Sequence, residues 1–150
     1  MATIFDVAAY VLERCDTMTT MKMQKLVFYS QAEFLTHYDY PLFAEDFQAW
    51  RGGPVCVELF QAHRHRFLIR PGELPLPENA QGLTTTEKEV INRVCDVLSL
   101  LSGNQLSERT HAEDPWKNMR VGLEPRQNSD RIISKESMRE YYTAHPVLVD

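Results

Sequence analysis

The segment from residue 21 to residue 37, MKMQKLVFYSQAEFLTH, constrains the fold of this chain more than any other. Apolar or small side chains recur at helical spacing on two of its faces: Met23, Leu26, Val27, Ser30 and Phe34 on one, and Met21, Phe28, Ala32 and Leu35 on the other. A helix that is apolar on two faces is usually surrounded by other elements of the core. The sequence therefore predicts that this segment is the central helix of the fold.

Capping residues and apolar spacing predict the remaining helices. Thr3 and Asp6 form a capping pair for a first helix, and Thr86 and Glu89 form one for a helix that ends at Gly103. Further helices are expected over about 54–67, 105–112, 115–122 and 134–142, the third of them begun by proline in its first turn.

These elements predict a mainly α fold. We expect a compact domain of about six helices around the central hydrophobic helix, with at most a short β element near 47–51 or 67–70. Residues 1–146 are expected to form a single domain, followed by a loose C-terminal tail at 147–150. The Gly52-Gly53-Pro54 sequence permits a tight turn with an unusual backbone conformation.

Charge and composition limit the classes of partner. Lys and Arg number 16 against 21 Asp and Glu, so the formal net charge is −5. Nucleic-acid binding normally needs a basic stripe, and the basic groups here are small, so direct DNA binding is disfavoured and a basic or mixed-charge protein partner is favoured. No run of about 18 apolar residues predicts a membrane span. The three cysteines lack metal-ligand spacing and fit buried apolar roles in a reducing cytoplasm.

The stretch His63-Arg64-His65-Arg66 is a first candidate for chemistry. The two histidines are two residues apart, which places them on diverging faces of a helix, so they cannot chelate one ion unaided. The stretch is therefore either a solvated helix end or a contact to a partner or phosphate group made through its two arginines.

The pair His111 and Asp114 is a second candidate. The aspartate could orient the histidine as a base, but it is better suited to cap a helix, and no nucleophile is evident nearby. A packed structural role for His111 and Trp116, or a role at the edge of a binding site, is preferred. No catalytic set, metal site or cofactor is predicted.

Trp50 and Arg51 precede the two glycines, and tryptophan and arginine are residue types that anchor protein interfaces. Both a core role and a contact role for Trp50 stay open. Lys22, Gln24 and Lys25 form a polar seam on the central helix. Such a seam is usually a solvated strip, but it can also hold the backbone of the fold itself or meet acidic groups on a partner.

The segment 21–31, MKMQKLVFYSQ, resembles the K-L-Q-K-L-L-Y-Y-A-Q helix of the Panacea antitoxin domain, a family that includes SocA-like antitoxins and GepA-like phage-associated proteins. The likeness continues in order through residues 41–60, returns between 106 and 116, and ends over 133–142. The residues that match the family motif are Lys22, Gln24, Lys25, Tyr29, Gln31, Trp50, Gly53, Pro54, Thr110, His111, Pro115 and Trp116. The chain departs from the pattern at Phe28, Ser30 and Gly52.

The resemblance implies a mostly helical, cytoplasmic protein that is the antidote of a toxin–antitoxin pair. Such antitoxins bind the toxin and occlude its active surface, or deliver it to a protease. The expected partner is a cognate protein toxin and not a membrane, nucleic acid is disfavoured, and homo-oligomerisation stays open. The candidate partner-binding residues are Trp50, Arg51, His63, Arg64, Arg66, Trp116 and Arg120.

Two other functions compete with this hypothesis. One is an enzyme that reverses a toxin's modification or hydrolyses a small nucleotide, with His111, Asp114 and Glu58 as site residues. The other is a transcriptional regulator of its own operon, although the chain shows no basic arm for DNA.

Overall fold

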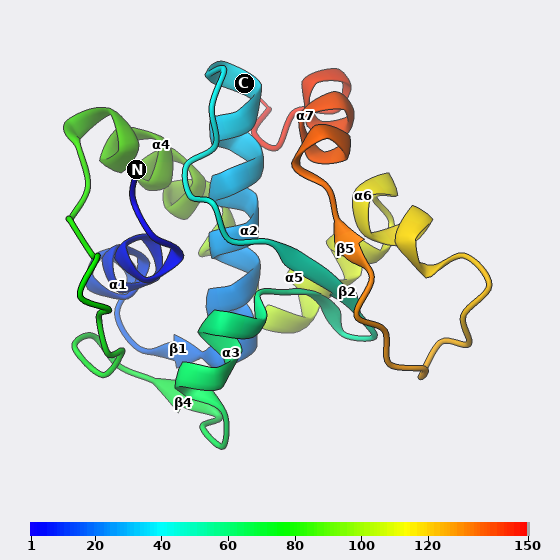
Figure 1. The fold of residues 1–150 in the computed structure, drawn as a ribbon, viewed down its shortest axis with the longest axis horizontal. Helices are drawn as coiled ribbons and strands as arrows, with labels where there is room; N and C mark the ends of the chain where they lie inside the picture. The colour runs from blue at the N-terminus through cyan, green and yellow to red at the C-terminus, as the bar shows by residue number, and fades with distance from the viewer. Residues whose placement is uncertain (150) are drawn as a thin grey trace.

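The computed structural model describes residues 1–149, and these form seven α-helices, one short 3-10 helix and five strands (Figure 1). The helices are α1 (Ile4–Cys15), α2 (Thr20–His37), α3 (Val57–His63), α4 (Thr85–Leu98), α5 (Gly103–His111), α6 (Asp114–Lys117) and α7 (Lys135–Ala144), with the 3-10 helix η1 at Asn118–Arg120. The strands are β1 (Met18–Thr19), β2 (Phe47–Trp50), β3 (Gly53–Val55), β4 (Leu68–Ile69) and β5 (Ile132–Ile133).

Helix α2 runs through the middle of the molecule. It packs against α1 and α4 on one side and against α5 and α7 on the other (Figure 1). Every residue from Met23 to Leu35 is buried, which agrees with the two apolar faces of the sequence. Because α2 touches most other elements, its few polar side chains must find partners inside the protein.

The prediction of a mainly α fold with at most one short β element is wrong, because the domain is mixed α/β with two small antiparallel sheets. In one sheet β1 pairs with β4, and in the other β2 lies between β3 and β5. No strand is longer than four residues in the described chain, so none is long enough to show a clear alternation of apolar and polar side chains. Most of these pairings also join segments remote in sequence.

The third helix is shorter than predicted. It begins at Val57 and ends at His63, whereas the sequence predicted 54–67. Pro54 belongs instead to β3, where it lies opposite Ala49. Proline is favourable in the first turn of a helix but is also tolerated at a strand position that donates no ladder hydrogen bond, and the sequence alone does not distinguish these two uses.

The boundaries of α4 and α5 also differ from the prediction. The capping box of α4 is formed by Thr84 and Glu87 rather than by Thr86 and Glu89. The three consecutive threonines offered equivalent choices. Gly103 does not end a helix; it is the first residue of α5, where the preceding serine caps the helix. The capping pair predicted at the start of α1 is confirmed.

Strands β2 and β3 form a tight hairpin whose turn is Arg51-Gly52. Gly53, the first residue after the turn, has a φ of 125°, a conformation that side chains with a Cβ atom rarely adopt. The glycine pair in the sequence thus correctly indicated a turn with an unusual backbone. Strand β3 of this hairpin packs against α2, and β2 pairs with β5 on its other edge (Figure 1).

The C-terminal segment is packed at Val147, whereas Val149 is 89% exposed. Val147 is 2% exposed, and its carbonyl accepts a hydrogen bond from Arg109 Nη2 at 2.7 Å. The loose tail expected at 147–150 stays a prediction, and Asp150 lies outside the described residues. None of the helices in residues 1–149 is long and apolar enough to span a membrane.

Candidate functional site

Lys25 lies in the middle of the protein with its charge group enclosed. The residue is 0% exposed, and Nζ has no hydrogen-bond partner among the described residues. Burial lowers the pKa of the Lys25 ammonium from 10.5 to about 7, because the charged form loses its hydration. The interpretation of this seam as a solvated strip is therefore wrong.

The backbone of the β2–β3 hairpin passes directly against Lys25. A Cβ atom at Gly53 would lie 2.4 Å from Lys25 Cε, 3.1 Å from Lys25 Nζ and 3.2 Å from Thr110 Oγ1. The Thr110 hydroxyl itself donates to the Ser107 carbonyl at 2.7 Å. Lys25 on α2, Gly53 on β3 and Thr110 on α5, which come from different parts of the family motif, thus meet at one point. Position 53 requires glycine because a Cβ atom would clash there and because the backbone has a positive φ.

Gln24 fastens the end of the hairpin to α2. Its Oε1 accepts a hydrogen bond from the Cys56 N–H at 3.0 Å, and its Nε2 donates to the Cys56 carbonyl at 3.2 Å. Its Nε2 also lies 3.0 Å from Nε2 of His63, which is 1% exposed. Burial, followed by the Lys25 charge, lowers the His63 pKa, so a neutral imidazole accepts this bond.

Gln31 anchors the chain that leads from α2 into β2. Its Oε1 accepts from the Leu42 N–H, and its Nε2 donates to the Phe43 carbonyl, both at 2.8 Å. With Gln24, this side chain shows that the polar residues of α2 hold the backbone of the fold itself, which was one of the alternatives for the seam. Lys22 lies apart from this group: its Nζ donates to the Ser99 carbonyl at 2.6 Å.

The opposite side of the hairpin is held by α5, α6 and η1. The His111 ring stacks on the Trp116 ring at 3.9 Å, with 7° between the planes. Trp116 Nε1 donates to the Trp50 carbonyl at 2.7 Å, and Arg120 Nη1 donates to the Ala49 carbonyl at 3.0 Å. The hairpin is therefore clamped between α2 on one side and the 111–120 segment on the other.

The clamped hairpin presents a few side chains outward. Arg51 is exposed and Trp50 is half-buried. The Trp50 ring packs against Phe60 at 4.9 Å, and its Nε1 donates to Gln48 Oε1 at 2.8 Å. A hollow of about 400 Å³ beside it is lined by Gln48, Trp50, Asn128, Ser129 and Asp130. We call these five residues together with Arg51 the hairpin face.

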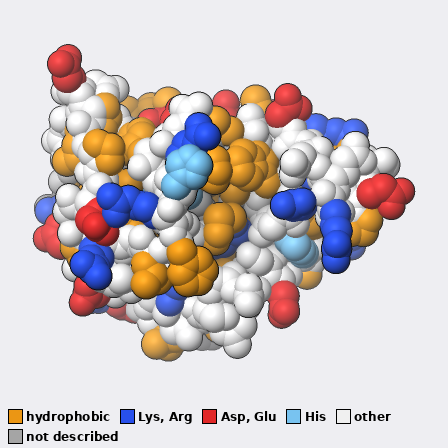
Figure 2. All heavy atoms as spheres, turned by 90° about the horizontal axis from the view of Figure 1, so that it is seen from below, with side chains coloured by type: hydrophobic (Ala, Val, Ile, Leu, Met, Phe, Trp, Pro, Cys, Tyr) orange, Lys and Arg blue, Asp and Glu red, His pale blue; other side chains and the backbone are white. Residues whose placement is uncertain are grey.

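The structure divides the seven predicted partner-binding residues. Arg51, Arg64 and Arg66 are exposed, and Trp50 and Trp116 are half-buried. His63 and Arg120 are buried and bonded inward, since Arg120 Nη2 also donates to the Gln127 carbonyl at 2.7 Å. These two residues hold the fold and do not reach the surface. Seen from below, the molecule shows apolar side chains gathered near the centre, with basic side chains scattered around them and not forming one stripe (Figure 2).

The residues of the enzyme hypothesis do not form a catalytic set. No hydrogen bond or ion pair joins any two of His111, Asp114 and Glu58 within residues 1–149. The prediction that Asp114 caps the following helix is also wrong: Glu113 occupies the N-cap position, without a side-chain cap, and Asp114 is the first helical residue. No group of three His, Cys, Asp or Glu side chains in the described chain is placed to hold a metal ion.

Glu113 is the centre of a polar cluster that sequence reasoning missed. Its Oε1 accepts hydrogen bonds from the Tyr29 hydroxyl at 2.5 Å and the Tyr142 hydroxyl at 2.9 Å. Its Oε2 accepts from Arg109 Nε at 3.3 Å. Burial is the main cause that raises the pKa of both tyrosines, with the Glu113 carboxylate adding to it. The i,i+4 spacing of Arg109 and Glu113 was the one signal of this cluster in the sequence.

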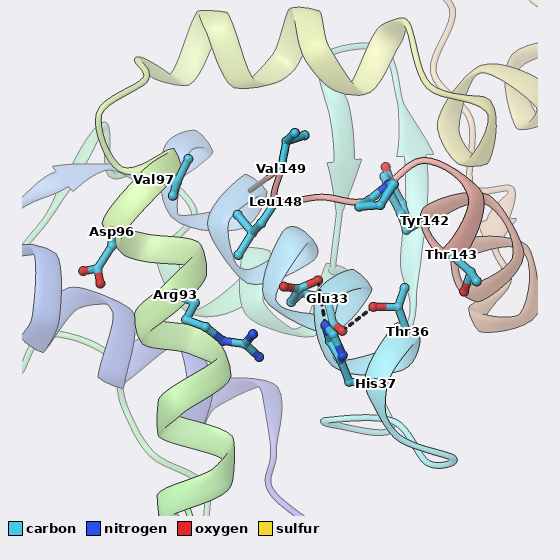
Figure 3. Close-up of a pocket in the computed structure, with 11 residues that line it drawn as sticks. Glu33, Thr36, His37, Arg93, Asp96, Val97, Tyr142, Thr143, Leu148 and Val149 are labelled. Atoms are coloured by element: carbon cyan, nitrogen blue, oxygen red, sulfur yellow. Dashed lines mark hydrogen bonds and ion pairs between the residues drawn. The ribbon is translucent and has the colours of Figure 1, made fainter.

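The largest hollow described, about 540 Å³, lies toward the C-terminal end of α2 (Figure 3). There Glu33 Oε1 lies 3.4 Å from His37 Nε2, and Arg93 reaches in from α4. None of the residues assigned to the family motif lines this hollow. Five motif residues instead converge on the hairpin: Gln24, Lys25, Gly53, Thr110 and Trp116.

The fold and the site together define a small α/β domain in which several motif residues fix the position of one hairpin. The family model described as "Antitoxin SocA-like, Panacea domain" matches residues 23–117, more than half of the chain. The chain belongs to this family of SocA-like antitoxins, as the resemblance of its motifs predicted. No curated protein and no solved structure matches it significantly.

Proposed function

We propose that this protein neutralises a cognate protein toxin by binding it directly through the hairpin face. Membership of the antitoxin family supports the antitoxin role. We choose this surface because several motif residues converge on the hairpin that bears Trp50 and Arg51. These motif residues are Lys25, Gly53, Thr110 and Trp116.

Trp50, the aromatic side chain of the hairpin face, is held in place before it meets a partner. The Trp50 ring is held by Phe60 and by its hydrogen bond to Gln48, and the Trp50 carbonyl is held by Trp116. A contact residue that is already ordered loses little conformational entropy on binding, so more of the interaction energy appears as affinity. Tryptophan and arginine are also the residue types most often found at energetic hot spots.

The chemistry of the face suggests what the toxin presents to it. Arg51 forms no ion pair with any side chain of residues 1–149 and is free to meet a carboxylate. The hollow beside Trp50 can receive one apolar or amide side chain. A stable interface buries at least about 1,000 Å² in total, so the exposed Arg64 at the end of α3 is proposed as part of its rim.

The first test is co-expression of the tagged protein with the product of the adjacent gene, the proposed toxin, scored by growth and by pull-down. We expect growth rescue together with a stable complex. Arg51→Glu should weaken both, whereas Arg93→Glu, an exposed arginine on α4 outside the hairpin face, should weaken neither. Rescue without a complex would overturn direct binding in favour of an enzymatic or protease-delivery mechanism, and the absence of both would overturn the pairing with that toxin.

A further inference from the structure

Two of the three cysteines lie together on the side of the molecule where α1 packs against α4. Cys15 is the last residue of α1, and Cys95 lies in the last turn of α4. Both line one hollow of about 280 Å³, together with Arg14, Lys22 and Ser99. Cys15 is partly exposed at this hollow, whereas Cys95 is 1% exposed.

The surroundings shift the pKa values of the two thiols in opposite directions. The Cys95 thiol and Ser99 lie beside Cys15 at this hollow, together with the positive charges of Arg14 and Lys22. The Cys95 hydrogen bond is the main cause that lowers the pKa of Cys15 to about 7, against the opposing effect of burial. The same bond and burial raise the pKa of Cys95. Cys15 therefore loses its proton more readily than Cys95, and the thiolate is the nucleophile in reactions of cysteine.

The third cysteine, Cys56, has neither a lowered pKa nor a neighbouring thiol among residues 1–149. Cys56 is fully buried, and burial raises its pKa to about 12. Its thiol donates to Glu58 Oε1 at 3.8 Å and no second thiol lies beside it in the described chain. Cys56 therefore serves as a control within the same molecule.

We propose that Cys15 is a modification site that reacts with hydroperoxides and that Cys95 resolves the product to a disulfide linking α1 to α4. In the first step the Cys15 thiolate attacks a peroxide oxygen and the O–O bond breaks, giving Cys15 sulfenic acid and releasing hydroxide or an alkoxide. In the second step the Cys95 sulfur displaces the sulfenic hydroxyl, and water leaves with the Cys95 proton. Two thiols are oxidised by two electrons in total, and one peroxide is reduced.

The geometry assigns the order of the two steps. Cys15 meets solvent at the hollow and carries the thiolate, so it is the residue that a peroxide reaches first. Cys95 is too buried to react first but lines the same hollow as Cys15, whose sulfur it must attack. The site is made of α1 and α4 and contains no residue of the hairpin face, so this inference does not depend on the proposed antitoxin role.

The test is to treat the folded, fully reduced protein with hydrogen peroxide, block free thiols with iodoacetamide and digest it with trypsin for mass spectrometry. We expect a disulfide-linked pair of peptides, 15–22 and 94–109, with Cys56 in peptide 52–64 still alkylated. Peroxide-treated protein in which both thiols remain alkylated, or in which Cys56 oxidises as fast as Cys15, would overturn the proposal.

Cys95→Ala separates the two roles. In this variant Cys15 should stop at sulfenic acid, trapped by dimedone, and form no internal cross-link. Because the hydrogen bond from Cys95 is lost, the midpoint for alkylation of Cys15 should also move up from about pH 7. Circular dichroism checks that the variant is folded. An unchanged midpoint, or peroxide-driven oxidation of wild-type Cys15 to sulfinic acid without a link to Cys95, would contradict the assignment of Cys95 as the resolving thiol.

Discussion

Replacing Lys25 by methionine gives the sharpest test of the buried motif. Methionine keeps the length and most of the volume of the lysine side chain but removes the ammonium group, which has no hydrogen-bond partner in the described part of the chain. Because the folded protein lowers the Lys25 pKa from 10.5 to about 7, the unfolded chain binds a proton more tightly than the folded one. Wild-type stability should therefore rise as the pH rises through this range.

The size of the effect follows from the two pKa values. The destabilisation caused by charged Lys25 is fully present below about pH 7 and disappears as the pH approaches 10.5, and it amounts in total to roughly 5 kcal/mol at about 1.4 kcal/mol per pKa unit. Between pH 7 and pH 9 the Lys25 contribution to wild-type stability should rise by about 2 kcal/mol. The Lys25→Met variant lacks this dependence and should be more stable than wild type at pH 7.

The assay is urea unfolding of both proteins at pH 7 and pH 9, followed by circular dichroism. The predicted result is a stability advantage of Lys25→Met that shrinks by about 2 kcal/mol between the two pH values. Cys15, whose pKa is lowered to about 7, also titrates in this range but is present in both proteins and cancels in the difference. Burial, and then the Lys25 charge, lowers the pKa values of His63 and His111 below 6.5, so both histidines titrate below the range from pH 7 to pH 9. An advantage that is equal at both pH values, or a variant less stable at pH 7, would refute the account of an unpartnered amine.

Three further substitutions test the clamp around the hairpin, each by urea unfolding. Gly53→Ala should lower the free energy of unfolding by about 2–4 kcal/mol, because of strain at a φ of 125° and the clash with the Lys25 side chain. The control Gly52→Ala should cost less than about 1 kcal/mol, because a Cβ atom there would meet nothing within 4 Å. Equal losses for the two variants would contradict the account. Glu113→Ala should cost about 3 kcal/mol because it leaves two tyrosine hydroxyls and an arginine without their shared acceptor, and a loss below about 1 kcal/mol would show that water replaces it. Trp116→Phe should cost about 1 kcal/mol through the lost hydrogen bond to the Trp50 carbonyl and should also weaken toxin binding; unchanged binding would argue against a rigid hairpin as the source of affinity.

The central helix could be predicted from sequence because its signal is local. The apolar residues of segment 21–37 fall on two faces, and burial on all sides follows from that pattern. The cap at Thr3 and the turn at Gly52-Gly53 are local signals of the same kind, and both are present in the structure. The family resemblance added the order of the motifs but not their positions in space.

The sheets and the burial of Lys25 could not be predicted because they depend on distant partners. Strand β5 lies more than 80 residues beyond β2, and two residues of a strand carry almost no periodicity. A lysine between glutamine and leucine on a helix normally marks the solvated strip. Here the hairpin covers that strip, because Gly53 brings its backbone directly over the lysine side chain.

For the candidate site, the residue types suggested which side chains bind a partner, but the sequence did not reveal which of them face outward. For Trp50 the sequence left a core role and a contact role open, and the structure places it half-buried, next to the exposed Arg51. His63 was grouped with them as part of the basic stretch 63–66, and Arg120 as an arginine, but both bond to groups inside the protein. Whether such a side chain faces in or out depends on carbonyls contributed by other segments, which a sequence pattern does not reveal.

The most direct test of toxin binding through the hairpin face is calorimetric titration of the purified toxin, the product of the adjacent gene, with three forms of this protein: wild type, the double variant Trp50→Ala/Arg51→Glu, and the control Arg93→Glu. We predict that the double variant binds at least about 100-fold more weakly than wild type, as expected for two hot-spot residues, while the control keeps the wild-type Kd. An unchanged Kd for a folded double variant would contradict the proposal that the hairpin face binds the toxin.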